Sequence, residues 1–171
     1  MDYLNLVLVT MLLGFVVFTL YQSIQKHKVC RENRSKFLEK HQNVREFNFT
    51  KKWNVFFVLL GAASLVMAAV SQPEEDVILF KLLFVWIAIM SISYVLENDM
   101  RRKLYVIDDG FLYDVNYYRF RSVDKCENKR SNSSMHLFDG DDVNLPKIIA
   151  NQVELEKEAW KQRKKDKKQN K

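Results

Sequence analysis

Residues 53–96 read WNVFFVLLGAASLVMAAV, then SQPEED, then VILFKLLFVWIAIMSISYVL. Six residues with one proline and three acids separate the two apolar segments, 53–70 and 77–96. At 1.5 Å of rise per residue, each segment predicts a helix of roughly 27 to 30 Å, which is about the thickness of the hydrocarbon core of a bilayer. The sequence therefore predicts two membrane-spanning helices joined by a tight hairpin.

A third apolar run, residues 4–21, lies at the N-terminus. A signal peptide is the competing interpretation, but Asp2 stands where a basic region would be, and no small-residue cleavage site follows the run. We therefore expect an uncleaved span and a membrane domain over residues 1–97.

Basic residues lie between and after the predicted spans. The segment 22–52 contains nine Lys or Arg, and three more follow the last span at 101–103. The other side carries Asp2 and the acids of the 71–76 hairpin. By the positive-inside rule, we expect a multi-pass protein of the cell membrane with the N-terminus outside and with the basic loop 22–52 and the C-terminus in the cytoplasm.

The basic loop contains one apolar helical face, formed by Phe37, Leu38, His41 and Val44. This spacing predicts a short helix lying on the inner leaflet. A solvated linker is the alternative interpretation.

The hydrophobic pattern changes to a period of two after Lys103. It predicts strands at residues 104–107, 111–117, 121–127, 134–138 and 142–145. Asp108-Asp109-Gly110 predicts a tight hairpin turn between the first two of these strands.

The last predicted element is a helix over residues 146–160, with Ile149, Val153 and Trp160 at helical spacing. Residues 161–171 carry seven Lys or Arg against one Asp, which predicts a polybasic tail that is too charged to fold by itself. The expected fold class is an α+β membrane protein, in which three transmembrane helices precede a small antiparallel β domain (98–160) closed by one C-terminal amphipathic helix.

Strands followed by one amphipathic helix on a membrane anchor resemble the pleckstrin-homology-like (PH-like) modules of bacterial membrane proteins. The chain also resembles the uncharacterised three-span inner-membrane family typified by YobD. The residues that carry this resemblance are KLYVIDDGFLY at 103–113 and the terminal helix 146–160. The long basic loop and the Lys-rich end depart from the family pattern. The resemblance implies an architecture but no activity, because the family has none established.

No motif for chemistry stands out in the sequence. The chain lacks phosphate-binding, dinucleotide, nucleophile-elbow and zinc-protease motifs. Cys30 and Cys126 are expected to be free thiols, and the three histidines lack zinc-ligand spacing. We therefore expect no enzyme, no metal and no cofactor.

The net charge of +6 favours an anionic partner. We expect anionic lipid of the inner leaflet as one partner and a membrane protein as another, with a homo-oligomer possible and no nucleic acid. The candidate lipid-binding residues are Arg101, Arg102, Lys103, Lys161, Arg163, Lys164, Lys165, Lys167 and Lys168.

These features predict an interaction, scaffold or accessory protein that presents a PH-like domain to a membrane complex or to anionic lipid. The alternative is an oligomeric component of membrane transport, or of self-protection against a membrane-active peptide. In the transport hypothesis Lys81 would line a path, although a lysine one turn inside a span can also extend to the interface. Ser64 and Ala68, with Gly61 and Ala62 nearby, form a small-residue face, which predicts a close approach to the first or third span.

Overall fold

A computed structural model of the chain describes residues 3–70, 77–128 and 132–169. The chain forms two compact units. The first unit, the helical unit, comprises residues 1–29 and 50–99, and the second, the β unit, comprises residues 30–49 and 100–171.

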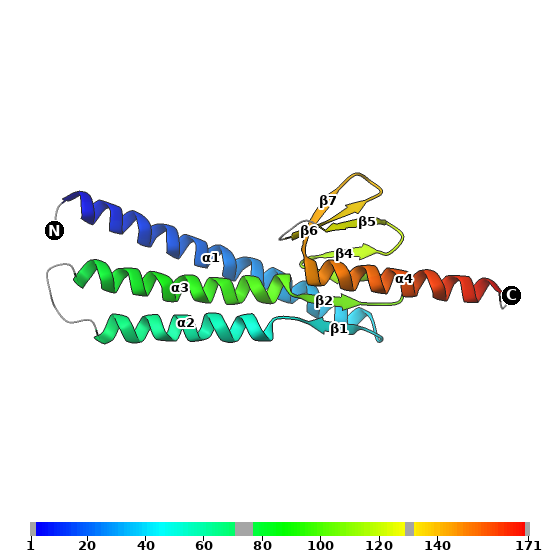
Figure 1. Ribbon diagram of the computed structural model, residues 1–171, viewed down its shortest axis with the longest axis horizontal. Helices are drawn as coiled ribbons and strands as arrows, with labels where there is room; N and C mark the ends of the chain where they lie inside the picture. Colours follow the sequence, from blue (N-terminus) through cyan, green and yellow to red (C-terminus); the bar gives the residue numbers. More distant parts are fainter. Residues whose placement is uncertain (1–2, 71–76, 129–131, 170–171) are drawn as a thin grey trace. The chain divides into compact units, whose positions relative to one another are not determined.

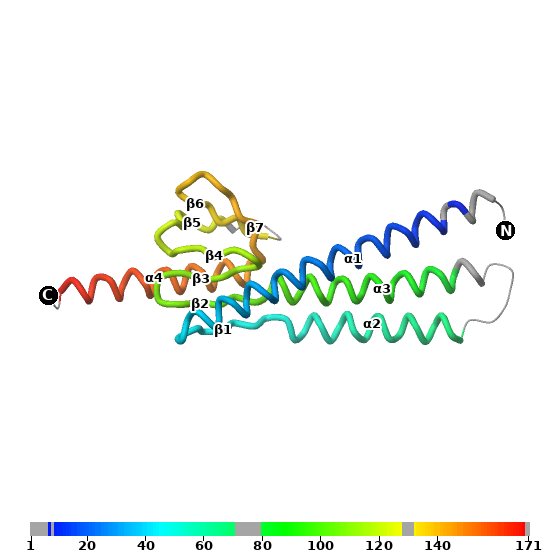
Figure 2. Tube along the Cα trace, turned by 180° about the vertical axis from the view of Figure 1, so that it is seen from behind, coloured from blue at the N-terminus to red at the C-terminus, as the bar shows by residue number. Residues whose placement is uncertain are grey.

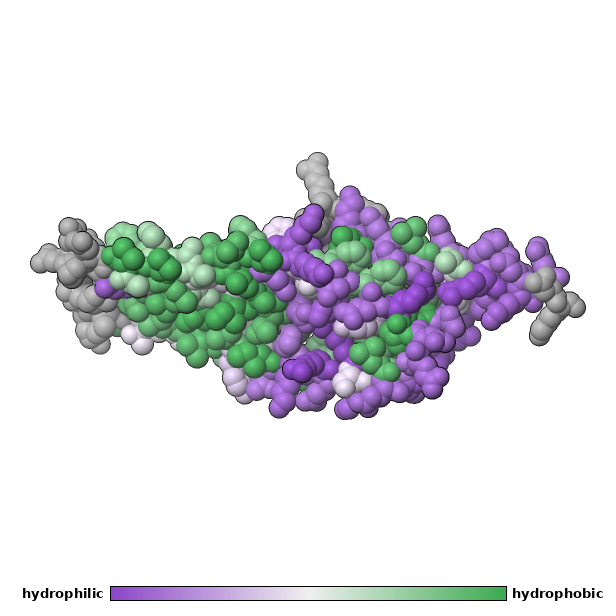
Figure 3. All heavy atoms as spheres, turned by 90° about the horizontal axis from the view of Figure 1, so that it is seen from below, coloured by the Kyte–Doolittle hydropathy of each residue, from purple (hydrophilic) through white to green (hydrophobic). Residues whose placement is uncertain are grey.

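The helical unit contains the first part of α1 (Tyr3–Lys40), together with α2 (Lys51–Val70) and α3 (Val77–Arg101) (Figure 1). Two segments, Lys51–Val70 and Phe80–Arg101, are long and apolar enough to cross a membrane. Only 11% and 17% of their most apolar windows are buried within the chain, so most of the apolar surface faces outward (Figure 3). The core helix of a soluble protein would show the opposite pattern.

The predicted pair of long apolar helices is therefore confirmed. Residues 4–21 are helical as predicted, within α1. Several side chains of this run lie outside the described residues, so its role as a third span stays a prediction.

The small-residue face of α2 lies against α3. A Cβ atom added to Gly61 would lie 3.2 Å from Cβ of Ser91, and Ser64 is buried. The hydroxyl of Ser64 donates to the carbonyl oxygen of Leu60 at 2.8 Å, which satisfies it within α2. The predicted close approach is confirmed, with the third predicted span as the partner.

Polar side chains join the helices near the start of α2 and the end of α3. The Asn98 amide donates to Oδ1 of Asn54 at 2.6 Å and to the carbonyl oxygen of Thr50 at 3.3 Å. Nε2 of His27 on α1 lies 3.2 Å from a carboxylate oxygen of Asp99. These bonds fix the register of the three helices at this end.

Two antiparallel sheets form most of the β unit (Figure 2). The first sheet has the order β1 (Arg45–Asn48), β2 (Lys103–Val106), β3 (Gly110–Tyr113) and β4 (Asn116–Arg119). The second sheet has the order β5 (Val123–Asn128), β6 (Asn132–Leu137) and β7 (Asp142–Pro146), and α4 (Lys147–Gln169) follows it.

Both faces of the first sheet are covered. On one face, Phe111 joins Met135 of the second sheet and Val153 of α4 in a core whose members are almost fully buried. On the other face, Leu112 packs with Phe37 from the C-terminal part of α1. Every residue of β3 is consequently buried, because alternate side chains enter the two cores.

The position of Phe37 shows that both interpretations of residues 22–52 are wrong. The segment is neither a leaflet-bound helix nor a linker, because α1 continues to Lys40 and then β1 pairs with β2. Phe37 is 8% exposed and covers the sheet, so it is not available to a membrane surface. Residues 30–49 are part of the β unit.

The predicted strand 111–117 is also wrong in part. The chain turns at Asp114 and Val115, so β3 and β4 are separate strands that pair with Tyr113 opposite Asn116. Asp114 has φ of 54°, a left-handed conformation that aspartate tolerates better than most residues. The other predicted strands are confirmed with boundaries shifted by one or two residues, with β5, β6 and β7 matching the third, fourth and fifth.

The predicted polybasic tail is helical as far as the structure describes it. The helix predicted to end at Trp160 continues to Gln169. Its first half is anchored by buried Ile149, Ala150 and Val153, and Gln162 donates to Asp166 at 3.2 Å in the second half. Packing of the first half supplies the helix nucleus that a charged segment lacks by itself.

Candidate functional site

The helical hairpin is inserted between two neighbouring strands of the β unit. The chain leaves β1 at Asn48, begins α2 at Lys51, ends α3 at Arg101 and begins β2 at Lys103. Across this insertion, the backbone N–H of Phe49 donates to the carbonyl oxygen of Arg102 at 2.9 Å. The β unit is therefore connected to both helices by one or two residues, not by a long linker.

The first three candidate lipid-binding residues lie at this junction. Arg101 is exposed at the end of α3, and Arg102 and Lys103 are half-buried. Burial lowers the pKa of the Arg102 guanidinium, which still leaves it protonated at neutral pH. Arg101 has no ion-pair partner among the residues that the structure describes.

The other candidate residues lie on the second half of α4. Lys161, Lys164, Lys165 and Lys168 are spaced to share one helical face, and all four are exposed. Arg163 instead pairs with Asp108 at 3.0 Å, and the ammonium group of Lys164 lies 4.2 Å from the centre of the Trp160 ring.

The structure does not join these two basic groups into one patch. Arg163 contacts Asp108, which lies beyond the end of β2, whereas Lys103 begins β2. Asp108 lies five positions after Lys103, a path of roughly 16 Å at 3.3 Å per residue of extended chain. One compact anion therefore cannot bridge the two groups.

Arg101 lines a polar cleft of about 450 Å³ within the β unit. Tyr113 and Asn116 line the cleft from the β3–β4 hairpin, and Asn132 and Asn144 line it from β6 and β7. These residues were not predicted as site residues. Each is a single polar residue in a short strand, and only the arrangement of the two sheets brings them together.

The cleft combines one cation, Arg101, and one acid, Asp114, with neutral hydrogen-bonding groups. Burial and the neighbouring Asp114 carboxylate raise the pKa of Tyr113 above its usual range, so the phenol stays protonated and can donate. The Asn116 amide donates to the Tyr118 hydroxyl at 3.4 Å at the same edge. This set of side chains can bind a small polar ligand but contains no paired acid and base for proton transfer.

His136 has two carboxylate neighbours outside the cleft. Its Nδ1 lies 2.5 Å from Asp142 and its Nε2 lies 3.3 Å from Glu127. Both carboxylates are well exposed, and among the described residues no nucleophile is hydrogen-bonded to His136. The described residues contain no group of three side chains placed to hold a metal ion.

A second polar pocket, of about 240 Å³, lies between β5 and α4. Its Lys157 ammonium group donates to the carbonyl oxygens of Val123 and Asp124 at 2.7 and 2.6 Å, so the strand already occupies it. Burial lowers the Lys157 pKa, with Lys161 adding to the effect, and burial raises the pKa of the nearby Cys126 thiol to about 11. This pocket therefore presents a structural lysine and an unreactive thiol.

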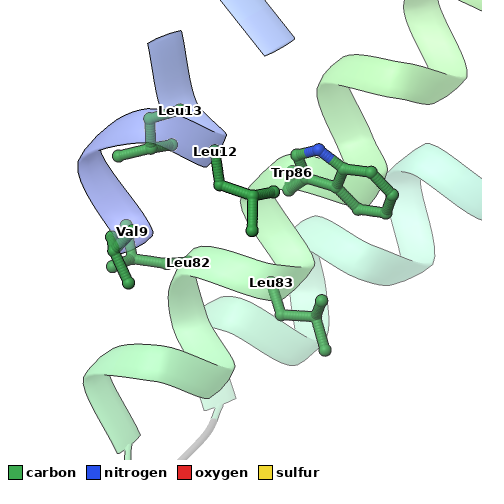
Figure 4. A pocket seen from close by; sticks show the side chains of 6 residues that line it. All are labelled: Val9, Leu12, Leu13, Leu82, Leu83 and Trp86. Carbon is green, nitrogen blue, oxygen red and sulfur yellow. The ribbon is translucent and has the colours of Figure 1, made fainter. Parts of the chain in front are cut away.

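An apolar cleft of about 120 Å³ lies in the helical unit, between α1 and α3 (Figure 4). Leu12 of α1 extends toward Trp86 of α3, and the other lining residues are Val9, Leu13, Leu82 and Leu83. Nε1 of Trp86 is buried without an acceptor among the described residues. The lining offers hydrophobic contact but no chemistry.

Comparison of the chain with protein-family models, with curated proteins and with solved structures finds no match.

Proposed function

We propose that this chain is an integral membrane interaction protein that holds a PH-like β unit at the cytoplasmic face of the cell membrane. There the β unit engages an anionic lipid headgroup or a membrane-protein complex. The observation that carries this proposal is the insertion of α2 and α3 between the paired strands β1 and β2. A module connected so closely to two apolar helices stays at the membrane surface, where headgroups and other membrane proteins are its nearest partners.

The architecture of the β unit supports the PH-like assignment. Two antiparallel sheets precede one C-terminal helix, and that helix packs on the core through Ile149 and Val153. The charges support the proposed side of the membrane, since the positive residues of α1, the start of α2 and the end of α3 lie together on the same end of the predicted spans.

The test purifies the full chain from its native membrane in mild detergent and identifies co-purifying lipids and proteins by mass spectrometry. Met135 is fully buried in the β unit, so Met135→Asp should unfold this unit and leave the helices in the membrane. Met135→Leu is the matched control, because leucine keeps the site apolar at similar volume.

We expect enrichment of an anionic lipid or of one membrane protein with the wild-type chain and with Met135→Leu. Met135→Asp should stay in carbonate-washed membranes and lose this enrichment. Release of the wild-type chain by carbonate would contradict the membrane anchor. The same co-purifying material in all three preparations would contradict a role for the β unit.

The proposed orientation is tested separately with reporters fused after Lys171. A fluorescent protein that matures only in the cytoplasm should be active there, and a phosphatase that needs an oxidising exterior should be inactive. The reverse result would place the β unit outside.

A further inference from the structure

The polar cleft contains a single strong cation. Arg101 is exposed and has no ion-pair partner among the described residues, and it is the cleft residue best suited to hold an anionic oxygen. Asp114 is the one acid that lines the cleft. A ligand with several negative charges would meet one guanidinium and be repelled by Asp114, so the lining favours a ligand with one negative charge.

The remaining polar groups suit hydroxyls. Asn116, Asn132 and Asn144 carry amide donors and acceptors, and Tyr113 offers a phenol that stays protonated. Two of these amides also bond within the β unit at 3.4 Å, since Asn116 donates to the Tyr118 hydroxyl and Oδ1 of Asn144 accepts from the Ser134 hydroxyl. Each keeps a second amide proton and a second lone pair for a ligand. A hydroxyl group both donates and accepts hydrogen bonds, so a ligand with hydroxyls matches these asparagine amides better than a ligand with a quaternary ammonium group does. The apolar atoms of Leu145 in the same lining can contact a short carbon backbone.

The position of Arg101 in the chain indicates where such a ligand would come from. It is the last residue of α3 and of the candidate span Phe80–Arg101. Chain continuity therefore places the guanidinium at the end of an apolar helix, at the level where headgroups lie if that helix spans the bilayer.

We infer that this cleft binds a phosphodiester carrying free hydroxyl groups, the chemistry of a glycerol phosphodiester. Arg101 binds the phosphodiester oxygens, and the asparagine amides bind the hydroxyls. The same chemistry occurs in phosphatidylglycerol and in soluble glycerophosphodiesters. The statement that the ligand is a lipid rests on the proposed membrane anchor, whereas the statement that the cleft binds a diester does not.

The experiment titrates the full chain in a non-ionic detergent by calorimetry with three probes. The first is dihexanoyl phosphatidylglycerol, the second is dihexanoyl phosphatidylcholine, and the third is water-soluble glycerophosphoglycerol. Arg101→Gln and Asn144→Leu test the cleft, and Arg121→Gln is the control because Arg121 is an exposed cation that does not line it. A second control, Lys164→Gln with Lys165→Gln, removes charge from α4. Thermal unfolding of each variant verifies that it is folded.

We expect phosphatidylglycerol to bind about tenfold more weakly to Arg101→Gln and several-fold more weakly to Asn144→Leu, with both controls at the wild-type affinity. Phosphatidylcholine should bind at least tenfold more weakly than phosphatidylglycerol. Equal affinity for these two lipids, or a loss of affinity confined to the α4 variant, would overturn the inference.

The soluble probe separates the two sources of the ligand. If glycerophosphoglycerol binds as tightly as the lipid, the inferred binding site stands and its ligand is a soluble diester. If only the lipid binds, and Arg101→Gln still removes this binding, the inferred binding site stands and its ligand is a membrane lipid. The carbonate wash described above tests the anchor independently, so the anchor and the cleft can fail separately.

Discussion

Gly110 occupies the first position of β3, where the chain comes very close to β4. A Cβ atom there would clash with the backbone oxygen of Tyr118 and lie 2.6 Å from the Tyr117 hydroxyl. The φ angle of Gly110 is not in the left-handed region. Among the described glycines, only Gly140 has a φ angle in that region. The glycine in the predicted Asp-Gly turn is thus required for space and not for turn conformation.

Gly110→Ala should therefore lower the free energy of unfolding by about 2 kcal/mol or more, because the clash includes backbone atoms that cannot move independently. Thermal unfolding of the full chain in detergent measures this loss. Gly14→Ala is the control, since an added Cβ there meets no described atom within 4 Å. Equal midpoints for the two variants would show that β4 moves away at little cost.

Cys126 is half-buried between β5 and α4, and burial raises its pKa to about 11. The thiolate is the reactive form, so the folded chain should alkylate slowly at neutral pH. In a Cys30→Ser background, we expect the rate at pH 7.5 to be about a hundredfold or more below that of the denatured chain, whose thiol has an ordinary pKa of about 8.5.

The rate for the folded chain should rise about tenfold per pH unit up to pH 10, without a plateau. The same pKa shift makes the free energy of unfolding depend on pH, because the folded state holds the thiol proton more tightly than the unfolded state does. Its contribution is therefore constant below about pH 8.5 and is lost as the pH rises toward 11. A plateau in the alkylation rate near pH 8.5 would contradict this environment for Cys126.

At the scale of elements, α2 and α3 depend on close packing at Gly61. A Cβ at this position would lie 3.2 Å from Cβ of Ser91, and the larger side chain of Gly61→Ile would separate the helices. Small residues at such contacts matter most in a bilayer, where hydrophobic burial does not drive helices together. We expect Gly61→Ile to lower the midpoint of thermal unfolding in detergent by several degrees.

Gly14→Ile on α1 is the matched control, and it should change this midpoint little because no described atom lies within 4 Å of the added Cβ. If the two substitutions had the same effect, the contact between α2 and α3 would not be the cause.

The elements that the sequence predicted are those whose signal is local. The apolar helices follow from hydrophobic length, and β2, β5, β6 and β7 follow from alternation between turn residues. β1 was missed because Arg45–Asn48 is short and mostly polar, and because its partner β2 lies more than fifty residues further on. The extension of α4 was missed because nucleation by the buried first half cannot be inferred from a charged segment alone.

The candidate site was predictable only in part. Arg101 was found from its position after an apolar segment, which is a local signal. Asn116, Asn132 and Asn144 come from three strands in two sheets, and nothing local distinguishes them from other surface asparagines. Their grouping depends on how the sheets pack, which the sequence pattern does not specify.

At the scale of the whole molecule, the β unit is discontinuous in sequence. It takes β1 and the C-terminal part of α1 from residues 30–49 and the rest from residues 100–171. Arg45 of β1 makes a bidentate ion pair with buried Glu156 of α4, with atoms at 3.1 and 2.5 Å. A chain of residues 100–171 alone would therefore leave Glu156 without its cation, with only the hydrogen bond from Gln152, and would leave the edge of β2 open and Leu112 uncovered.

The two parts of the β unit can be joined without the helices, because Phe49 and Arg102 are hydrogen-bonded neighbours at 2.9 Å. We expect residues 30–49, linked through a two- to four-residue Gly-containing turn to residues 101–171, to fold as a soluble protein with a cooperative thermal transition. Residues 100–171 alone should lack this transition or unfold at a much lower temperature, since a buried carboxylate without its cation and an uncovered apolar face of the sheet both destabilise it. Circular dichroism and amide proton spectra measure both chains under the same conditions. If residues 100–171 alone unfolded with the same midpoint, β1 and the C-terminal part of α1 would be additions to a β domain that is complete without them.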